Sequence, residues 1–190
     1  MPRWFAARVS LDVKCSKIDS FLRGRALLLA LPFLTLASAA RGDSIWNATT
    51  GDWNVSGNWS PSGVPGTFTD VRIGTTSTNF TANITSANAS SGWAYIGYAS
   101  GNVGTVNVLN GWTWTSTLEI DIGLDGNGTI NVQSGGKVSG LGVFGRDSSG
   151  VGSVIISGIG SRWSGSLTVG DLGTGTLTIQ SGGSASTSSG

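Results

Sequence analysis

Two carboxylates in the middle of the chain are the first candidates for chemistry. Glu119 and Asp121 alternate with apolar residues, so an extended strand sends both carboxylates to the same outward face, with their α-carbons about 7 Å apart. Carboxylate pairs at such separations perform acid and base catalysis in glycosidases. The alternative is two solvated charges on an outer face. Because a fold does not imply a site, we expect a non-enzymatic chain, and a polysaccharide lyase or hydrolase using Glu119 and Asp121 is the alternative.

Three aspartates follow recurring glycines and raise the question of calcium in stacked turns. Asp125, Asp147 and Asp171 each fall one or two residues after such a glycine. The calcium-binding nonapeptide pattern, with paired glycines and an aspartate at fixed offsets, is absent. An aspartate that caps its own turn is the commoner arrangement. We therefore predict no metal site and no cofactor.

Two tryptophans at spacing two form a third candidate site. Trp112 and Trp114 are expected to share one face of a strand, either inward as core or outward as a platform for a sugar ring. Trp163 stands at the matching place of a later repeat, which favours a recurrent packing role. Carbohydrate contact through Trp112 and Trp114 is the alternative.

The elements that position these residues are internal repeats that run from Asp70 to the last residue. Each repeat ends in an apolar residue followed by glycine, and the spacings between these glycines are 23, 26, 22 and 25. The glycines are Gly74, Gly97, Gly123, Gly145 and Gly170. Behind them apolar residues recur at spacing two, as in Val106 and Val108 or Ile130 and Val132, which is the periodicity of a strand.

The repeat length selects the fold class. A unit of 22–26 residues carries one or two short strands whose apolar face cannot be buried within the unit, so neighbouring units must stack. We predict an all-β fold, a right-handed parallel β-helix or a closely related β-solenoid, over residues 70–190. A propeller is the alternative, because two units counted together approach the length of one blade.

The first 40 residues have the features of a secretory signal peptide. A basic start is followed by an apolar run from Ala26 to Leu36 and a small-residue exit, with cleavage expected after Ala39 or Ala40. A membrane-spanning helix needs about twenty apolar residues, roughly twice the length of this run. We therefore predict a secreted chain whose mature part does not span a membrane.

Charge excludes one class of partner. Residues 1–40 contain six of the 11 basic and two of the 10 acidic residues, which leaves five basic and eight acidic residues and a net charge of −3. No basic stripe remains, so nucleic acid binding loses its physical basis. The mature chain has no cysteine, and its stability must come from stacking of the repeats.

A tryptophan-rich segment, residues 44–69, precedes the repeats. Trp46, Trp53 and Trp59 stand among Asn, Gly and Ser. Bulky aromatic residues placed over the open end of a solenoid would block pairing with another chain, so we predict a cap. The alternative is a row of exposed indoles that stack on sugars.

The repeats resemble those of a known group of proteins. The phrases Val169-Gly170-Asp171-Leu172-Gly173-Thr174-Gly175-Thr176-Leu177-Thr178-Ile179 and Ile159-Gly160-Ser161-Arg162-Trp163 are similar to repeats of bacterial autotransporter passengers and of PEP-CTERM-associated surface proteins. The resemblance covers residues 44 to 190. It implies a β-solenoid at the outer surface of a Gram-negative-type cell, a stalk or adhesin.

The resemblance also sets expectations about partners. It implies contact with a surface polysaccharide or with a host or neighbouring cell. Neither the membrane barrel of an autotransporter nor a sorting tail is present, and Gly190 falls inside a repeat, so we expect a piece of a longer protein. We also expect self-association through the open edge of the solenoid. A carbohydrate-binding surface protein is the remaining alternative.

Overall fold

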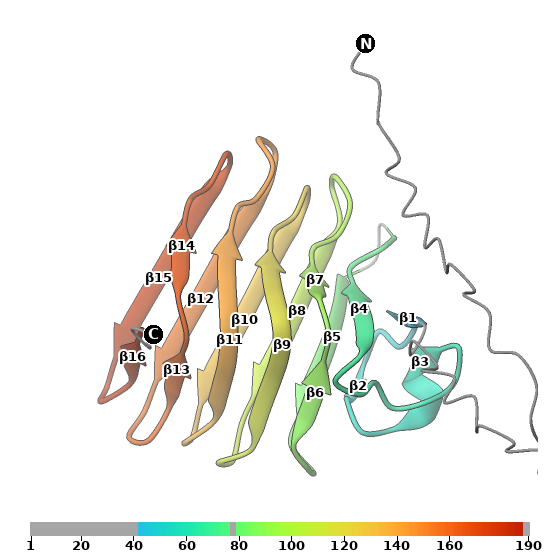
Figure 1. Ribbon diagram of the computed structural model, residues 1–190, viewed down its shortest axis with the longest axis horizontal. Helices are drawn as coiled ribbons and strands as arrows, with labels where there is room; N and C mark the ends of the chain where they lie inside the picture. Colours follow the sequence, from blue (N-terminus) through green and yellow to red (C-terminus); the bar gives the residue numbers. More distant parts are fainter. Residues whose placement is uncertain (1–41, 77–78, 188–190) are drawn as a thin grey trace, which may run out of the picture. The chain divides into compact units, whose positions relative to one another are not determined.

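The computed structural model describes residues 42–76 and 79–187, and its strands form two sheets that face each other (Figure 1). The ten-stranded sheet contains β1 (Gly42–Trp46), β3 (Trp59–Ser60), β4 (Thr69–Ile73), β6 (Ala89–Ser91), β7 (Ala94–Ile96), β9 (Thr113–Ile122), β11 (Lys137–Phe144), β13 (Arg162–Ser164), β14 (Leu167–Val169) and β16 (Ser184–Ser186). The six-stranded sheet contains β2 (Thr50–Asp52), β5 (Asn79–Ile84), β8 (Val103–Val108), β10 (Asn127–Gln133), β12 (Val151–Ser157) and β15 (Thr174–Gln180).

The chain alternates between the two sheets and advances by one rung at each turn. In the six-stranded sheet, Val103 pairs with Asn127, Asn127 with Val151, and Val151 with Thr174, and all these ladders are parallel. The result is a parallel β-solenoid of about six turns with rungs of about 24 residues. The predicted fold class is therefore confirmed, and the propeller alternative is wrong because propeller blades belong to antiparallel architecture.

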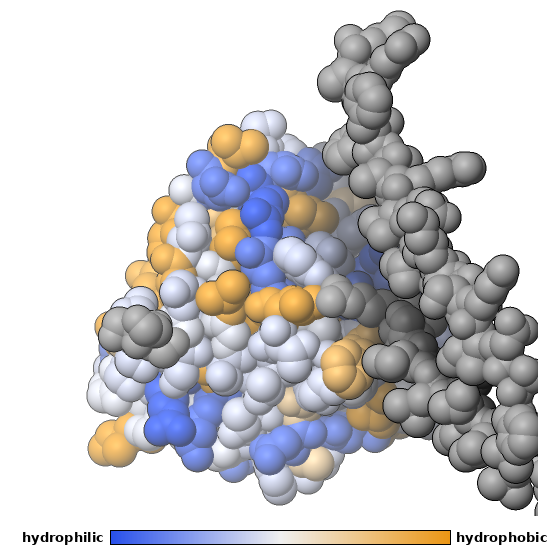
Figure 2. Space-filling view, viewed as in Figure 1, coloured by the Kyte–Doolittle hydropathy of each residue, from blue (hydrophilic) through white to orange (hydrophobic). Residues whose placement is uncertain are grey.

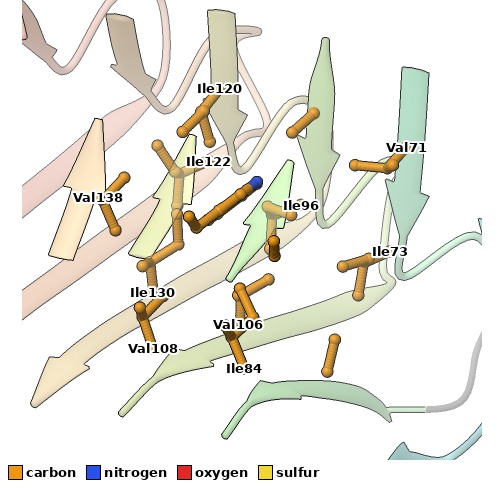
Figure 3. Packing of buried hydrophobic residues seen from close by; sticks show 14 of the residues in the cluster. Val71, Ile73, Ile84, Ile96, Val106, Val108, Ile120, Ile122, Ile130 and Val138 are labelled. Carbon is orange, nitrogen blue, oxygen red and sulfur yellow. The ribbon is translucent and has the colours of Figure 1, made fainter. Parts of the chain in front are cut away.

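The core is a column of aliphatic side chains between the two sheets. Along β8 and β10 buried and partly exposed residues alternate, as the spacing-two pattern predicted. Figure 3 shows side chains of both sheets pointing toward one another, among them Ile96, Val106 and Ile120. Each fully buried Val or Ile contributes about 1.5–3 kcal/mol relative to an exposed side chain. The apolar side chains of one rung are covered by those of the rungs before and after it. The stability of the fold therefore comes from stacking of the rungs.

Glycine at the repeat ends allows the rungs to approach closely. Gly97 has a φ of +69°, and a Cβ built there would lie 2.4 Å from the backbone carbonyl carbon of Asn127. Gly123 has a φ of +71° and the same relation to Val151, at 2.4 Å. Any larger residue would collide with the backbone of a neighbouring rung, which explains why the recurring glycines mark the repeat.

An amide ladder follows the outer face of the six-stranded sheet. The side-chain nitrogen of Asn107 donates to the side-chain oxygen of Asn83 at 2.8 Å, and Asn131 donates to Asn107 at 2.8 Å. The three residues are in register on β5, β8 and β10. The ladder therefore ties three rungs together on the face opposite to the core.

The tryptophan-rich segment supplies the first rung. β1 pairs in parallel with β4, β2 pairs in parallel with β5, and β3 lies antiparallel beside β1. The indoles of Trp46, Trp53 and Trp59 are buried, and the Trp59 ring lies 4.9 Å from Trp46 and 4.7 Å from Trp53 in edge-on contacts. These indoles pack inside the fold, so the alternative of three exposed sugar platforms is wrong.

Two further expectations concern the membrane and the leader. Within residues 42–76 and 79–187, no helix is long and apolar enough to cross a bilayer. The predicted signal peptide, with its cleavage positions Ala39 and Ala40, lies outside the described residues.

Candidate functional site

Glu119 and Asp121 lie on the outer face of β9, as their alternation with core residues predicted. Between and after them, Ile120 and Ile122 are fully buried in the core. Asp121 nevertheless exposes only 2% of its surface, and Glu119 is only partly exposed. The expectation of two solvated outer carboxylates is therefore wrong for Asp121, because residues of later rungs cover it.

The covering residue is Arg146, which follows the glycine at the end of β11. Its Nε lies 2.8 Å from Oδ1 of Asp121, its Nη2 contacts the carboxylate of Glu119, and its Nη1 lies 3.8 Å from Oδ2 of Asp171. The Arg146 backbone N–H donates to the carbonyl of Gly123 on the preceding rung at 3.0 Å, which fixes the start of the side chain. One guanidinium therefore bridges carboxylates on either side of its own rung. We call Glu119, Asp121, Arg146 and Asp171 the Arg146 network.

Opposing effects act on the protonation of Asp121. Burial, and after it the negative charges of Asp147 and Asp171, raise the pKa of Asp121 to about 7. The guanidinium of Arg146 at 2.8 Å stabilises the ionised carboxylate and acts in the opposite direction. The charged form of Asp121 in this buried position therefore depends on Arg146.

This geometry does not offer a substrate two free carboxylates. In a glycosidase, both carboxyl groups must reach the glycosidic bond or an attacking water. Here Asp121 is buried beneath Arg146, and Glu119 contacts the same guanidinium. The arrangement ties three rungs together by charge-assisted contacts and leaves Asp121 inaccessible to a sugar.

An aromatic cluster lies beside the network on the same outer face. Tyr95 of β7 is in register with Asp121, and its ring is parallel to that of Trp93, with centroids 6.1 Å apart. The Tyr98 ring meets Tyr95 edge-on at 5.7 Å and is covered by the Arg72 guanidinium at 4.8 Å. Burial, followed by the charges of Asp70 and Asp121, raises the pKa of Tyr95. The cluster extends the interactions of this face to the earlier rungs.

The sequence interpretation missed both Arg146 and this cluster. The spacing of Trp93 and Tyr95 around buried Ala94 is a strand signal that places both rings on the outer face. Arg146 had no such signal, because its contact with Asp121 joins residues 25 positions apart. Only the register between rungs brings the two together.

Trp114 is a core residue. Its ring is fully buried, lies 5.3 Å from Trp53, and its indole nitrogen donates to the Ser91 hydroxyl at 3.2 Å. Val138 of β11 pairs with both Trp114 and Trp163, so the two tryptophans occupy one column, in agreement with the predicted recurrent packing. Carbohydrate contact through Trp114 is therefore wrong, because no face of the indole reaches solvent.

Trp112 differs from Trp114 in position and exposure. It lies just before β9, is partly buried against the core, and donates its indole N–H to the carbonyl of Thr85 at 2.8 Å. The indole is thus held by the preceding rung. Carbohydrate contact through Trp112 stays a prediction.

The three candidate calcium ligands do not come together. Asp171 belongs to the Arg146 network, whereas Asp125 accepts the hydroxyl of Ser149. Within the described ranges, no group of three or more His, Cys, Asp or Glu side chains is placed to hold a metal ion. The side-chain contacts of Asp125 and Asp171 instead join neighbouring rungs.

No protein-family model matches this chain, and neither a curated protein nor a solved structure matches it.

Proposed function

We propose that this chain is a non-enzymatic structural segment of an exported surface protein, where it serves as a stalk or passenger for display and adhesion. The Arg146 network carries the proposal. Its guanidinium occupies the two carboxylates that a polysaccharide lyase or hydrolase would need free, and it links three successive rungs instead.

The β-solenoid suits such a role. Its rungs are joined by parallel ladders, and its length grows with each added repeat without a change in the core. Export is supported by the basic start, the apolar run and the small-residue exit of residues 1–40. A surface location beyond the inner membrane rests on the resemblance to passenger repeats.

Export is tested with residues 1–190 produced in a Gram-negative host. We expect the chain in the periplasm or medium, with a mature mass that corresponds to cleavage after Ala39 or Ala40. A matched variant, Leu29→Arg, interrupts the apolar run and is expected to keep the uncleaved chain in the cytoplasm. Cytoplasmic, uncleaved wild-type chain would contradict the proposal.

The non-enzymatic part has its own test. The exported chain is incubated with uncharged and acidic polysaccharides, and newly formed reducing ends and unsaturated products are measured. We expect none above the level of the buffer. Cleavage that Glu119→Gln abolishes, in a variant with unchanged circular dichroism, would establish the enzymatic alternative.

A further inference from the structure

A groove crosses the rungs where the ten-stranded sheet bends. The register between β9 and β11 shifts between Ser139 and Leu141, and the neighbouring rungs interrupt the strand at the same level, between β6 and β7 and between β13 and β14. Two hollows of about 240 and 320 Å³ lie along this bend and share Thr117 and Leu118 as lining residues. We call their joint surface the bend groove.

The bend groove runs along the solenoid axis. Its lining comes from five successive rungs: Phe68 before β4, Gly92 between β6 and β7, Thr117 and Leu118 in β9, Leu141 in β11, and Ser164 at the end of β13. With neighbouring strands about 4.8 Å apart, four spacings give a length of roughly 19 Å. An extended polymer fits this shape better than a compact ligand.

The groove combines apolar and hydroxyl groups. Phe68 and Leu141 expose 67% and 48% of their surface, and Leu118 lies between them along the groove. The hydroxyl-bearing lining residues are Thr67, Thr117, Ser139 and Ser164, together with Ser116, which is buried and donates its hydroxyl to the carbonyl of Gly92. Figure 2 shows a hydrophobic band that crosses this face horizontally, with a strongly hydrophilic stripe above it and a pale region below it.

Charge selects among polymers. No residue that lines either hollow carries a charge. Charges of both signs flank this lining: Glu119 belongs to the Arg146 network, whereas Lys137 and Arg162 lie two residues before Ser139 and Ser164 on the same strand faces. The flanking charges therefore select neither an anionic nor a cationic chain, and the uncharged lining favours an uncharged one.

The backbone of the groove also disfavours a peptide that binds by strand addition. Gly142 N–H donates to the Ser166 carbonyl at 2.9 Å, and Gly165 N–H donates to the Ser186 carbonyl at 2.9 Å, so these groups already bond along the solenoid. A β-strand ligand needs a row of unpaired backbone groups. The side chains, and not the backbone, are what the groove presents.

We propose that the bend groove binds an extended, uncharged polysaccharide that lies parallel to the solenoid axis. Such a chain offers C–H surfaces to Phe68, Leu118 and Leu141 and hydroxyl groups to the serines and threonines; the apolar contacts come from three of the five rungs and the hydroxyl contacts from four. The inference names a ligand class for the adhesive role and rests on that proposed function. It places a carbohydrate contact at residues other than Trp112 and Trp114.

Affinity electrophoresis of the exported chain tests the proposal. Native gels contain hydroxyethylcellulose, laminarin, galactomannan or dextran as uncharged probes, and alginate as an anionic one. We expect at least one uncharged probe to retard the chain and alginate to leave its mobility unchanged. Leu141→Ser and Phe68→Ser, at different ends of the groove, are each expected to weaken the retardation about fivefold, the effect of losing roughly 1 kcal/mol of apolar contact.

The control is Ile159→Ser, an apolar-to-polar change at a residue that is 90% exposed and does not line the groove. It is expected to bind like the wild type, and all three variants should keep the wild-type circular dichroism because the replaced side chains are exposed. Absence of retardation by every uncharged probe, equal retardation of all variants, or preference for alginate would each overturn the inference. None of these outcomes affects the export and cleavage tests, so the two proposals fail separately.

Discussion

Replacing Arg146 by methionine tests whether the Arg146 network stabilises the fold. The change keeps an apolar stem and removes the guanidinium, which leaves Asp121 buried at 2% exposure without its cationic partner. Removing one member of a buried ion pair costs about 3–5 kcal/mol. Arg146 itself is partly exposed, so we expect the lower end, about 3 kcal/mol. For a folded unit of this size that corresponds to a fall in Tm of roughly 6–12 °C.

The pH dependence of this loss has a definite sign. Burial and the charges of Asp147 and Asp171 raise the pKa of Asp121 to about 7, whereas an unfolded aspartate has a pKa of about 3.9. With Arg146 in place, the fold loses stability as the pH rises from about 4 through about 7, because folded Asp121 holds its proton more tightly than the unfolded chain does. Removing the guanidinium raises the pKa of Asp121 further, so the variant goes on losing stability above about pH 7 and its difference from the wild type grows there.

The assay is thermal unfolding followed by circular dichroism at intervals between pH 4 and pH 9. Arg162→Met is the matched control, because Arg162 is exposed and forms no ion pair among the described residues. The double variant Asp121→Asn, Arg146→Met should recover part of the lost Tm, because no buried charge is left at position 121. It should also show little of the pH dependence, because asparagine does not titrate. Equal Tm losses for Arg146→Met and Arg162→Met, or a loss that does not vary with pH, would refute the reasoning.

Three further experiments probe the rungs. Asn107→Ala removes both side-chain hydrogen bonds of the amide ladder and should lower the free energy of unfolding, measured in urea, by about 1–3 kcal/mol. Asn131→Ala removes one of these hydrogen bonds and should cost about half as much. Trp114→Ala empties a fully buried site and should cost about 3–5 kcal/mol, so loss of cooperative unfolding is expected and wild-type stability would contradict the core assignment. Gly97→Ala should destabilise the fold far more than Gly101→Ala, because both have positive φ but only Gly97 lies against a neighbouring rung; equal Tm values would contradict this account.

The rungs could be predicted because each one repeats two local signals. The first signal is the glycine at the repeat end, as at Gly97 and Gly123, where φ is positive and the backbone of a neighbouring rung lies close. The second is the spacing of two between apolar residues such as Val106 and Val108, because only one face of the strand is buried. Both signals depend on neighbouring residues in the chain. The first rung has only part of this pattern, because β1 and β2 end in Trp46 and Asp52 and no apolar residue followed by glycine marks them. Its parallel pairing with β4 and β5 was therefore not predicted.

The site depended on information that the sequence does not hold locally. Alternation correctly placed Glu119 and Asp121 outward, yet their exposure is decided by Arg146, which lies one rung later. For Trp114, spacing two indicates that residues share a face without saying which face is inward. The matching place of Trp163 in a later repeat favoured packing, and the register places Trp114, Val138 and Trp163 in one column.

Register also explains why the outer face of the ten-stranded sheet carries two distinct arrangements of side chains. Residues in register stand in a column along the axis, as Ser139 does with Thr115 and Ser164. The apolar residues of the bend groove lie where this register is interrupted, since Leu141 pairs with Glu119. Arg146 contacts residues outside its own column, because its long side chain extends to Asp121 on the preceding rung and toward Asp171 on the following one. The register therefore aligns similar residues along the axis, whereas the unrepeated Arg146 joins three neighbouring rungs through its contacts with carboxylates.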